Sequence, residues 1–139
     1  MNGQVEEFEL QLQQYLLESM SYFDDSGKHP EKFYHGLVLG MMISLAKTYH
    51  IKSNHESGFG RYDVMLIPND KSKLGIILEF KTVFKAQDKL EDAAQEALAQ
   101  IKKRHYETEL TQQGIQKILQ LGLAFRGKEV CVASERNFE

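Results

Sequence analysis

The stretch of sequence that determines the fold is RYDVMLIPNDKSKLGIILEFK, residues 61–81. Two apolar segments flank a polar segment, which is typical of two strands joined by a turn. If the strands fold back about Lys71, then Asp63 lies opposite Glu79, because both are equally far from Lys71 in the sequence. Opposed residues of an antiparallel pair point to one face, and Lys81, two residues after Glu79, shares that face. The hairpin therefore predicts an Asp, a Glu and a Lys at one end of two strands.

Two interpretations of these charges are compatible with the spacing. Neighbouring carboxylates repel each other unless a cation lies between them, and magnesium prefers such oxygen ligands. Alternatively, Glu79 and Lys81 form a solvated ion pair worth about 0–1 kcal/mol, and Asp63 pairs with Arg61. Residues 76–78 are apolar on both faces, which indicates a buried central strand. Unpaired charge at the end of such a strand is costly, which favours the metal site.

The pattern Asp, hairpin, Glu-x-Lys resembles the active-site signature of the PD-(D/E)XK nuclease superfamily. The matching blocks are FYHG (33–36), ESGFGRYD (56–63), ILEFK (77–81), ALAQI (97–101) and GLAF (122–125). The signature alone is degenerate, whereas the GFGRYD, Gln and Gly-x-Ala-Phe blocks are much more specific. The resemblance spans about residues 8 to 132, and Tyr62 stands where the superfamily's name has a Pro that is often missing. Within the superfamily, the chain most resembles the nuclease domain found at the C-terminal end of many bacterial proteins that have an AAA-type ATPase domain in front.

The resemblance implies a fold and a chemistry. The fold is of the α/β class (mixed α+β), with a restriction-endonuclease-like αβββαβ core and a mixed sheet flanked by helices. Asp63 and Glu79 would bind Mg²⁺ or Mn²⁺, the backbone carbonyl of Phe80 would add an oxygen, and Glu56 is a further candidate ligand. Lys81 would orient the attacking water or stabilise charge on the phosphate.

Each of the further candidate site residues has two interpretations, a role in the site and a purely structural role. Gln100, at the edge of an apolar helix face, is a catalytic candidate or a polar surface residue. Tyr106 contacts phosphate or only packs, and His35 faces the active site or is a satisfied core residue. Arg61 binds phosphate or pairs with a carboxylate. Glu31, near a helix start, fits an electrostatic cap better than the acidic site residue of the first core helix.

Periodicity and turn signals predict the order α, α, β, β, β, α, β, β. The predicted helices are 5–23, 30 to about 49, and 86 to about 109; the strands are 49–54, 61–67, 75–81, 118–125 and 129–133; and a turn lies at 58–60. The first helix and last strand extend the superfamily core. We expect a single domain, 1–139, in which 1–29 is an N-terminal helical extension.

Composition sets further limits. The chain has 139 residues, 42% of them hydrophobic, which suits one packed domain. No apolar run is long enough to cross a membrane, and the single Cys131, predicted to be a buried strand thiol, suits the cytoplasm. The net charge of −3 argues against a strong nonspecific nucleic-acid binder but leaves a nuclease open. A local basic strip is conceivable at Lys81, Lys85 and Lys89, and the basic cluster at 102–105 also fits a solvated helix end.

The leading hypothesis is a metal-dependent nuclease that hydrolyses phosphodiester bonds of nucleic acid, DNA in preference to RNA. The alternative is a non-catalytic binding or regulatory module of nuclease fold, attached to an ATPase. An assembly domain is a third hypothesis that nothing in the sequence demands. A homodimer and an N-terminal ATPase domain are compatible partners.

Overall fold

The computed structural model describes residues 6, 9–14, 16–18, 30–42, 47–53, 56–57, 60–61 and 64–138, the side chains of 30–33, 35, 41, 56–57 and 60–61 excepted. The helices are α2 (Pro30–Met42), α3 (Leu90–Lys103) and α4 (Glu107–Gln112). The strands are β1 (Tyr49–Ser53), β2 (Glu56–Ser57), β3 (Gly60–Arg61), β4 (Val64–Pro68), β5 (Gly75–Thr82), β6 (Ile118–Arg126) and β7 (Glu129–Arg136). Residues 9–14 and 16–18, here called the N-terminal helical residues, are also helical.

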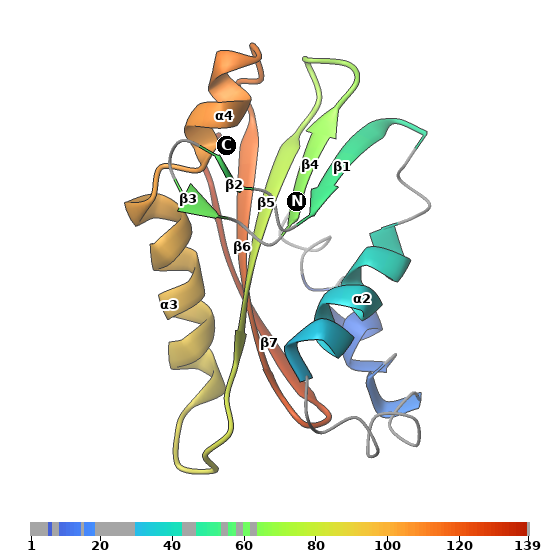
Figure 1. Cartoon of the computed structure of the whole chain (residues 1–139), viewed down its shortest axis with the longest axis vertical. Helices are drawn as coiled ribbons and strands as arrows, with labels where there is room; N and C mark the ends of the chain where they lie inside the picture. Colours follow the sequence, from blue (N-terminus) through green and yellow to red (C-terminus); the bar gives the residue numbers. More distant parts are fainter. Residues whose placement is uncertain are drawn as a thin grey trace.

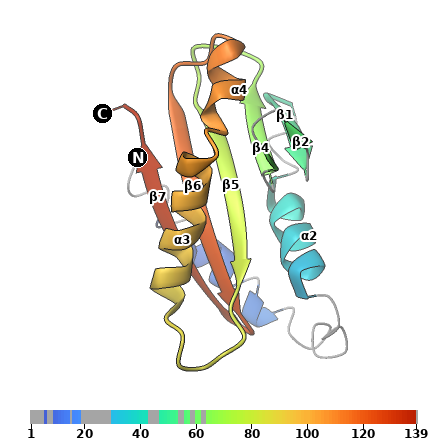
Figure 2. The same ribbon diagram turned by 60° about the vertical axis from the view of Figure 1, so that its left-hand side comes forward.

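A five-stranded sheet in the order β1-β4-β5-β6-β7 forms the centre of the molecule. The pair β5–β6 is parallel and the other neighbouring pairs are antiparallel. A parallel pair needs a crossover connection, and α3 with α4 supplies it. Figures 1 and 2 show α3 against one face of the sheet and α2, with the N-terminal helical residues, on the other side. The predicted α/β fold, a mixed sheet flanked by helices, is confirmed.

The sheet separates two apolar cores. Met65 of β4 and Ile77 of β5 belong to the core under α3, here called the α3-side core. Val64 and Leu78 of the same strands belong to the opposite core, which also contains Leu12 of the N-terminal helical residues. Successive strand residues point to opposite faces, so β4 and β5 contribute to both cores. This explains why their sequences are apolar without alternation.

The turn between β4 and β5 has the predicted register. Val64 pairs with Leu78 and Leu66 with Ile76, so the two strands are related about Lys71 as expected. The Asp70 carboxylate accepts hydrogen bonds from the Ser72 backbone N–H at 3.0 Å and the Ser72 hydroxyl at 2.7 Å. These bonds, with the hydroxyl contributing most, hold the pKa of Asp70 below its usual value. The polar turn therefore closes on itself and fixes the pairing of the strands.

Helix α3 packs so closely on β6 that one position admits only glycine. A Cβ atom on Gly122 would lie 2.3 Å from the carbonyl oxygen of Ala94 and 2.6 Å from the backbone nitrogen of Leu98. Both are backbone atoms of α3, which cannot move away as a flexible side chain can. Gly122 pairs with Glu79 across the parallel strands. The close contact therefore sets the distance between α3 and the strand that carries Glu79.

The predicted helix over 86–109 is wrong at its start and is interrupted. The chain up to Lys89 is a loop, because the guanidinium of Arg126 binds backbone carbonyls there, including Lys85 at 3.0 Å. Helix α3 ends at Lys103, and α4 begins only at Glu107. Between them His105 has a φ of 54°, a left-handed conformation that no α-helix continues through.

The second predicted helix is too long. It was expected to reach about Tyr49, but α2 ends at Met42 and residues 47–48 form a turn. Tyr49 instead begins β1 and pairs with Pro68 of β4, so tertiary pairing overrides the helical pattern at this end. Residues 43–46 lie outside the described part of the chain.

The remaining strands follow the prediction with three changes. Gly60, the last residue of the turn expected at 58–60, begins β3, which pairs with β2 in a small antiparallel ribbon where Glu56 pairs with Arg61; residues 58 and 59 lie outside the described part of the chain. Arg61 therefore belongs to β3, not to the strand expected over 61–67, which begins at Val64. The last strand extends beyond Ala133 to Arg136, because Arg136 pairs with Leu119.

Candidate active site

Glu79 is held in the middle of the molecule by β5. Its side chain is 8% exposed, and among the described residues it is the only charged side chain that is buried. Alternation along β5 places it on the same face as Ile77, beneath α3. Burying a carboxylate is costly, so a fold rarely retains one without a partner or a ligand. A buried titratable group of this kind is a candidate functional residue.

Lys81 lies two residues further along β5, where the strand reaches solvent. Its Nζ atom lies 2.8 Å from Oε2 of Glu96 on α3, which shows that it points to the same side as Glu79. The two side chains are 44% and 63% exposed, so the ion pair is worth about 0–1 kcal/mol. Sequence reasoning missed Glu96, because only the packing of α3 on β5 brings these two residues together.

Asp63, the predicted partner of Glu79, lies outside the described residues. In the sequence it precedes Val64, whose partner Leu78 precedes Glu79, so the described register is the one that the site prediction requires. Glu56 and Arg61 are described only as backbone, in the ribbon of β2 and β3. The side chains of His35 and Glu31, both in α2, also lie outside the described part.

Two candidates on the helical side are fully described. Gln100 lies in the last turns of α3 and is partly exposed, which is compatible with either of its predicted roles. Tyr106 is 1% exposed and belongs to the α3-side core together with Ile101 and Leu110. Its burial favours the packing alternative over contact with phosphate. Neither position tests a catalytic role.

Phe80 contributes its ring to the opposite face of the sheet. The ring packs edge-to-face against Phe125, with 6.0 Å between the ring centroids. The side chain therefore plays no part on the Glu79 face, and only its backbone carbonyl remains a candidate ligand.

The carboxylate oxygens of Glu79 are suitable ligands for a hard cation. Carboxylate oxygens are the ligands that magnesium and manganese prefer. Within the described residues no group of three or more His, Cys, Asp or Glu side chains is placed to hold a metal ion, so a site here would need ligands from side chains outside them, such as Asp63 or Glu56. Burial, followed by the carboxylates of Glu9 and Glu91, raises the pKa of the Cys131 thiol, which disfavours the thiolate needed of a ligand or nucleophile. No described helix is long and apolar enough to span a membrane.

Comparison with known proteins gives one match. A family model described as the PD-(D/E)XK nuclease superfamily matches residues 29–135. No curated protein and no solved structure matches the chain significantly. The matched range contains the β4–β5 hairpin, Glu79, Lys81, β6 and all of β7 except its last residue. The chain belongs to the PD-(D/E)XK nuclease superfamily.

Proposed function

We propose that this chain is a divalent-metal-dependent nuclease that hydrolyses phosphodiester bonds. The observation that carries the proposal is the burial of Glu79 at 8% exposure on the strand that brings Lys81 to solvent. Membership of a nuclease superfamily supports the same reaction class. Val64 pairs with Leu78, so the same register continued by one residue would set Asp63 opposite Glu79. This supports Asp63 as the second carboxylate.

Each residue has a distinct role in this proposal. Asp63, Glu79 and the carbonyl of Phe80 would hold Mg²⁺ or Mn²⁺, with Glu56 as a further ligand. When bound, the ion would lower the pKa of a water molecule and neutralise the phosphodiester. Lys81 would orient the attacking water or stabilise charge on the phosphate. Its ion pair with Glu96 is weak enough to be exchanged for a phosphate.

The finer parts of the proposal concern the substrate and partners. Gln100 would line the site from α3, and Arg61 and His35 would contact substrate. We propose DNA in preference to RNA, and an ATPase domain ahead of this one, on the resemblance of the sequence blocks. A homodimer is compatible with this arrangement.

The test is cleavage of labelled DNA and RNA oligonucleotides while Mg²⁺ or Mn²⁺ is titrated, with a chelator as the blank. We expect metal-dependent cleavage by the wild type and its loss in Asp63→Asn and Glu79→Gln. Glu135→Gln, an exposed carboxylate on β7, is the matched control and should cleave normally. Cleavage that persists in the chelator, or in both site variants, would contradict the proposal.

The ion pair of Lys81 with Glu96 also favours a second function. In the absence of a phosphate Glu96 occupies Lys81 at 2.8 Å, and a lysine engaged in this way would also suit a non-catalytic binding or regulatory module. Oligonucleotide binding without cleavage at any ion concentration would support this alternative. Restoration of cleavage by Glu96→Gln would instead show that the pair inhibits an otherwise intact site.

A further inference from the structure

A groove beside Lys81 is the feature that carries a further inference. It is a cavity of about 520 Å³ between the end of β5, the loop that follows and the first turns of α3, at the lowest turn in Figure 1. The residues that matter for its chemistry are Lys81, Phe84, Lys85, Lys89, Asp92 and Glu96. Sites of about 300–1,000 Å³ accommodate small organic ligands, so a nucleotide fits this volume.

Phe84 places an aromatic ring in this groove and leaves most of it exposed. It is 73% exposed, the highest value among the large apolar residues described as exposed. A single exposed apolar side chain is common and needs no explanation by itself. Phe84 differs because Lys81, Lys85 and Lys89 line the same groove. An aromatic ring among cationic side chains is the combination with which proteins bind unpaired nucleic-acid strands.

Hydrogen bonds with residues of β6 hold the loop that carries Phe84. The guanidinium of Arg126 donates hydrogen bonds to the carbonyl of Lys85 at 3.0 Å and to the carbonyl of Asp88 at 2.5 Å. The backbone N–H of Val83 donates to the carbonyl of Phe125 at 2.7 Å. The exposed ring is therefore held on an anchored loop, so the binding of a stacked ligand costs little entropy for ordering the loop.

The charges of the groove are divided between its two sides. The lysines stand at 81, 85 and 89, at the end of β5, in the loop and directly before α3, whereas Asp92 and Glu96 line the side of α3 and Asp88 lies in the loop next to Lys89. Phosphates are attracted to the first side and repelled by the second. A single strand can place its phosphates on one side and its bases on the other, and carboxylates can accept hydrogen bonds from base amino groups. A duplex carries phosphates on both sides, so it fits this division less well.

We propose that Phe84 stacks on an unpaired base while Lys85 and Lys89 bind phosphates of the same nucleic-acid strand. The strand then continues to Lys81. The nucleic acid at the site is then single-stranded. This inference rests on the proposed nuclease function, because that function gives Lys81 its role at the phosphodiester.

The chain offers a direct probe of stacking, because it contains no tryptophan. Phe84→Trp therefore introduces a single tryptophan at the proposed contact, whose fluorescence can be excited apart from that of the tyrosines. We expect a single-stranded oligonucleotide, added with a chelator to prevent cleavage, to quench this tryptophan strongly. A blunt duplex of the same sequence should quench it several-fold less. Equal quenching by both would overturn the preference for single strands.

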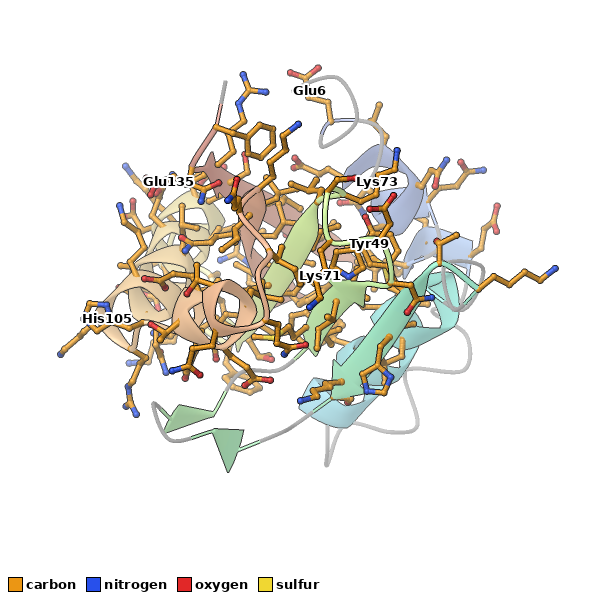
Figure 3. All side chains as sticks on the ribbon, turned by 90° about the horizontal axis from the view of Figure 1, so that it is seen from above. Glu6, Tyr49, Lys71, Lys73, His105 and Glu135 are labelled. Atoms are coloured by element: carbon orange, nitrogen blue, oxygen red, sulfur yellow. The ribbon has the colours of Figure 1, made fainter. Side chains whose placement is uncertain are left out.

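Binding measurements with fluorescently labelled oligonucleotides supply the second readout. Phe84→Ala should weaken single-strand binding about 10-fold, since a base stacked on an aromatic ring is worth about 1–3 kcal/mol. Lys85→Ala and Lys89→Ala should each reduce the salt dependence of binding by about 0.7 in slope. Lys71→Ala with Lys73→Ala is the matched control, because these exposed lysines lie on the β4–β5 turn at the other end of the molecule (Figures 1 and 3).

The outcomes separate this inference from the proposed function. If the wild type cleaves but the tryptophan is not quenched by bound single strand, or if Phe84→Ala binds as tightly as the wild type, the inference is overturned and the nuclease stands. If quenching and weakened binding are seen but no ion supports cleavage, the inference stands and the nuclease proposal fails. An unchanged melting temperature of Phe84→Ala, expected because the side chain is exposed, ensures that lost binding is not lost folding.

Discussion

Glu79 and Lys81 stand two residues apart on one face of β5, yet their surroundings differ sharply. The Glu79 side chain is 8% exposed and that of Lys81 is 44% exposed. A carboxylate that must hold a cation benefits from a fixed, buried position, because desolvation strengthens its electrostatic interactions. A lysine that must follow a moving phosphate benefits from a solvated position and a weak ion pair. The gradient of burial along β5 thus matches the two proposed roles.

The first prediction concerns metal binding at the residue scale. Mg²⁺ or Mn²⁺ should raise the melting temperature of the wild type, because the ion binds the folded site and not the unfolded chain. At an ion concentration 100 times the Kd the stabilisation is about 2.7 kcal/mol. Asp63→Asn and Glu79→Gln should lose most of this rise in a thermal scan, while the control Glu135→Gln keeps it. An equal rise in all four proteins would mean that the ions bind elsewhere.

The second prediction separates binding from chemistry. Lys81→Ala should cleave a labelled oligonucleotide about 10²-fold more slowly or worse, because it lacks the cation that stabilises the transition state. Its metal affinity, measured by calorimetry, should hold or increase, since a competing positive charge is removed. The fold should survive, because the side chain lies at the solvent end of β5. If the variant cuts as fast as the wild type, Lys81 is only an ion-pair partner of Glu96.

At the scale of elements, the distance between α3 and the sheet depends on Gly122. The third prediction is that Gly122→Ala destabilises the protein by at least about 1–3 kcal/mol, as overpacking against immovable atoms does. The new Cβ would lie 2.3 Å from the Ala94 carbonyl oxygen, so α3 must shift away from Glu79. Gly40→Ala is the matched control. Apart from its own helix, none of the described residues lies within 4 Å of a Cβ there, so in helix α2 this change should stabilise by about 0.5–1 kcal/mol. Denaturant unfolding measures both, and equal effects would contradict the close contact.

The elements also show why sequence patterns locate strands better than helix ends. The β4–β5 hairpin was predictable because polar turn residues and apolar runs fix its register locally. The break between α3 and α4 was not, because Ile101, Tyr106 and Leu110 are all buried and continue the apolar period through it. The late start of α3 depends on Arg126, which is distant in sequence from the loop it holds. The two-residue strands β2 and β3 are too short to show a period.

The candidate site shows the same contrast between features that the local sequence determines and features that depend on tertiary packing. The shared face of Glu79 and Lys81 on one strand was predictable because strand alternation is local, whereas their role in a site stays a prediction. Glu96, Phe84 and the groove between them were not predictable, because they depend on how α3 lies against β5. Cys131 lies in a strand as predicted but is partly buried rather than buried, and this burial is the main cause that raises the pKa of its thiol.

At the scale of the whole molecule, the two cores place Glu79 in a protected part of the fold. Strands β5 and β6 lie in the middle of the sheet, with pairing partners on both sides and apolar cores on both faces. Strands β1 and β7 are edges, and each has one unpaired side within the described sheet. The carboxylate of Glu79 is therefore anchored to a rigid strand, whereas the groove beside Lys81 is built on a loop.

The last prediction tests the rigidity of the central strands against that of the edge strands by hydrogen exchange followed by mass spectrometry or NMR. Amides of β6 and of residues 76–78 in β5 should exchange only through global unfolding, because these residues pair with a strand on each side and lie between the two cores. Amides of β1 and β7 that face the open edges should exchange earlier through fraying. Gly122→Ala should accelerate exchange in α3 and β6 before it affects β4, since the strain it introduces lies between α3 and β6. Exchange of β5 as early as that of β1 would show that Glu79 is not held by a rigid centre, and that the site is assembled only when ligand binds.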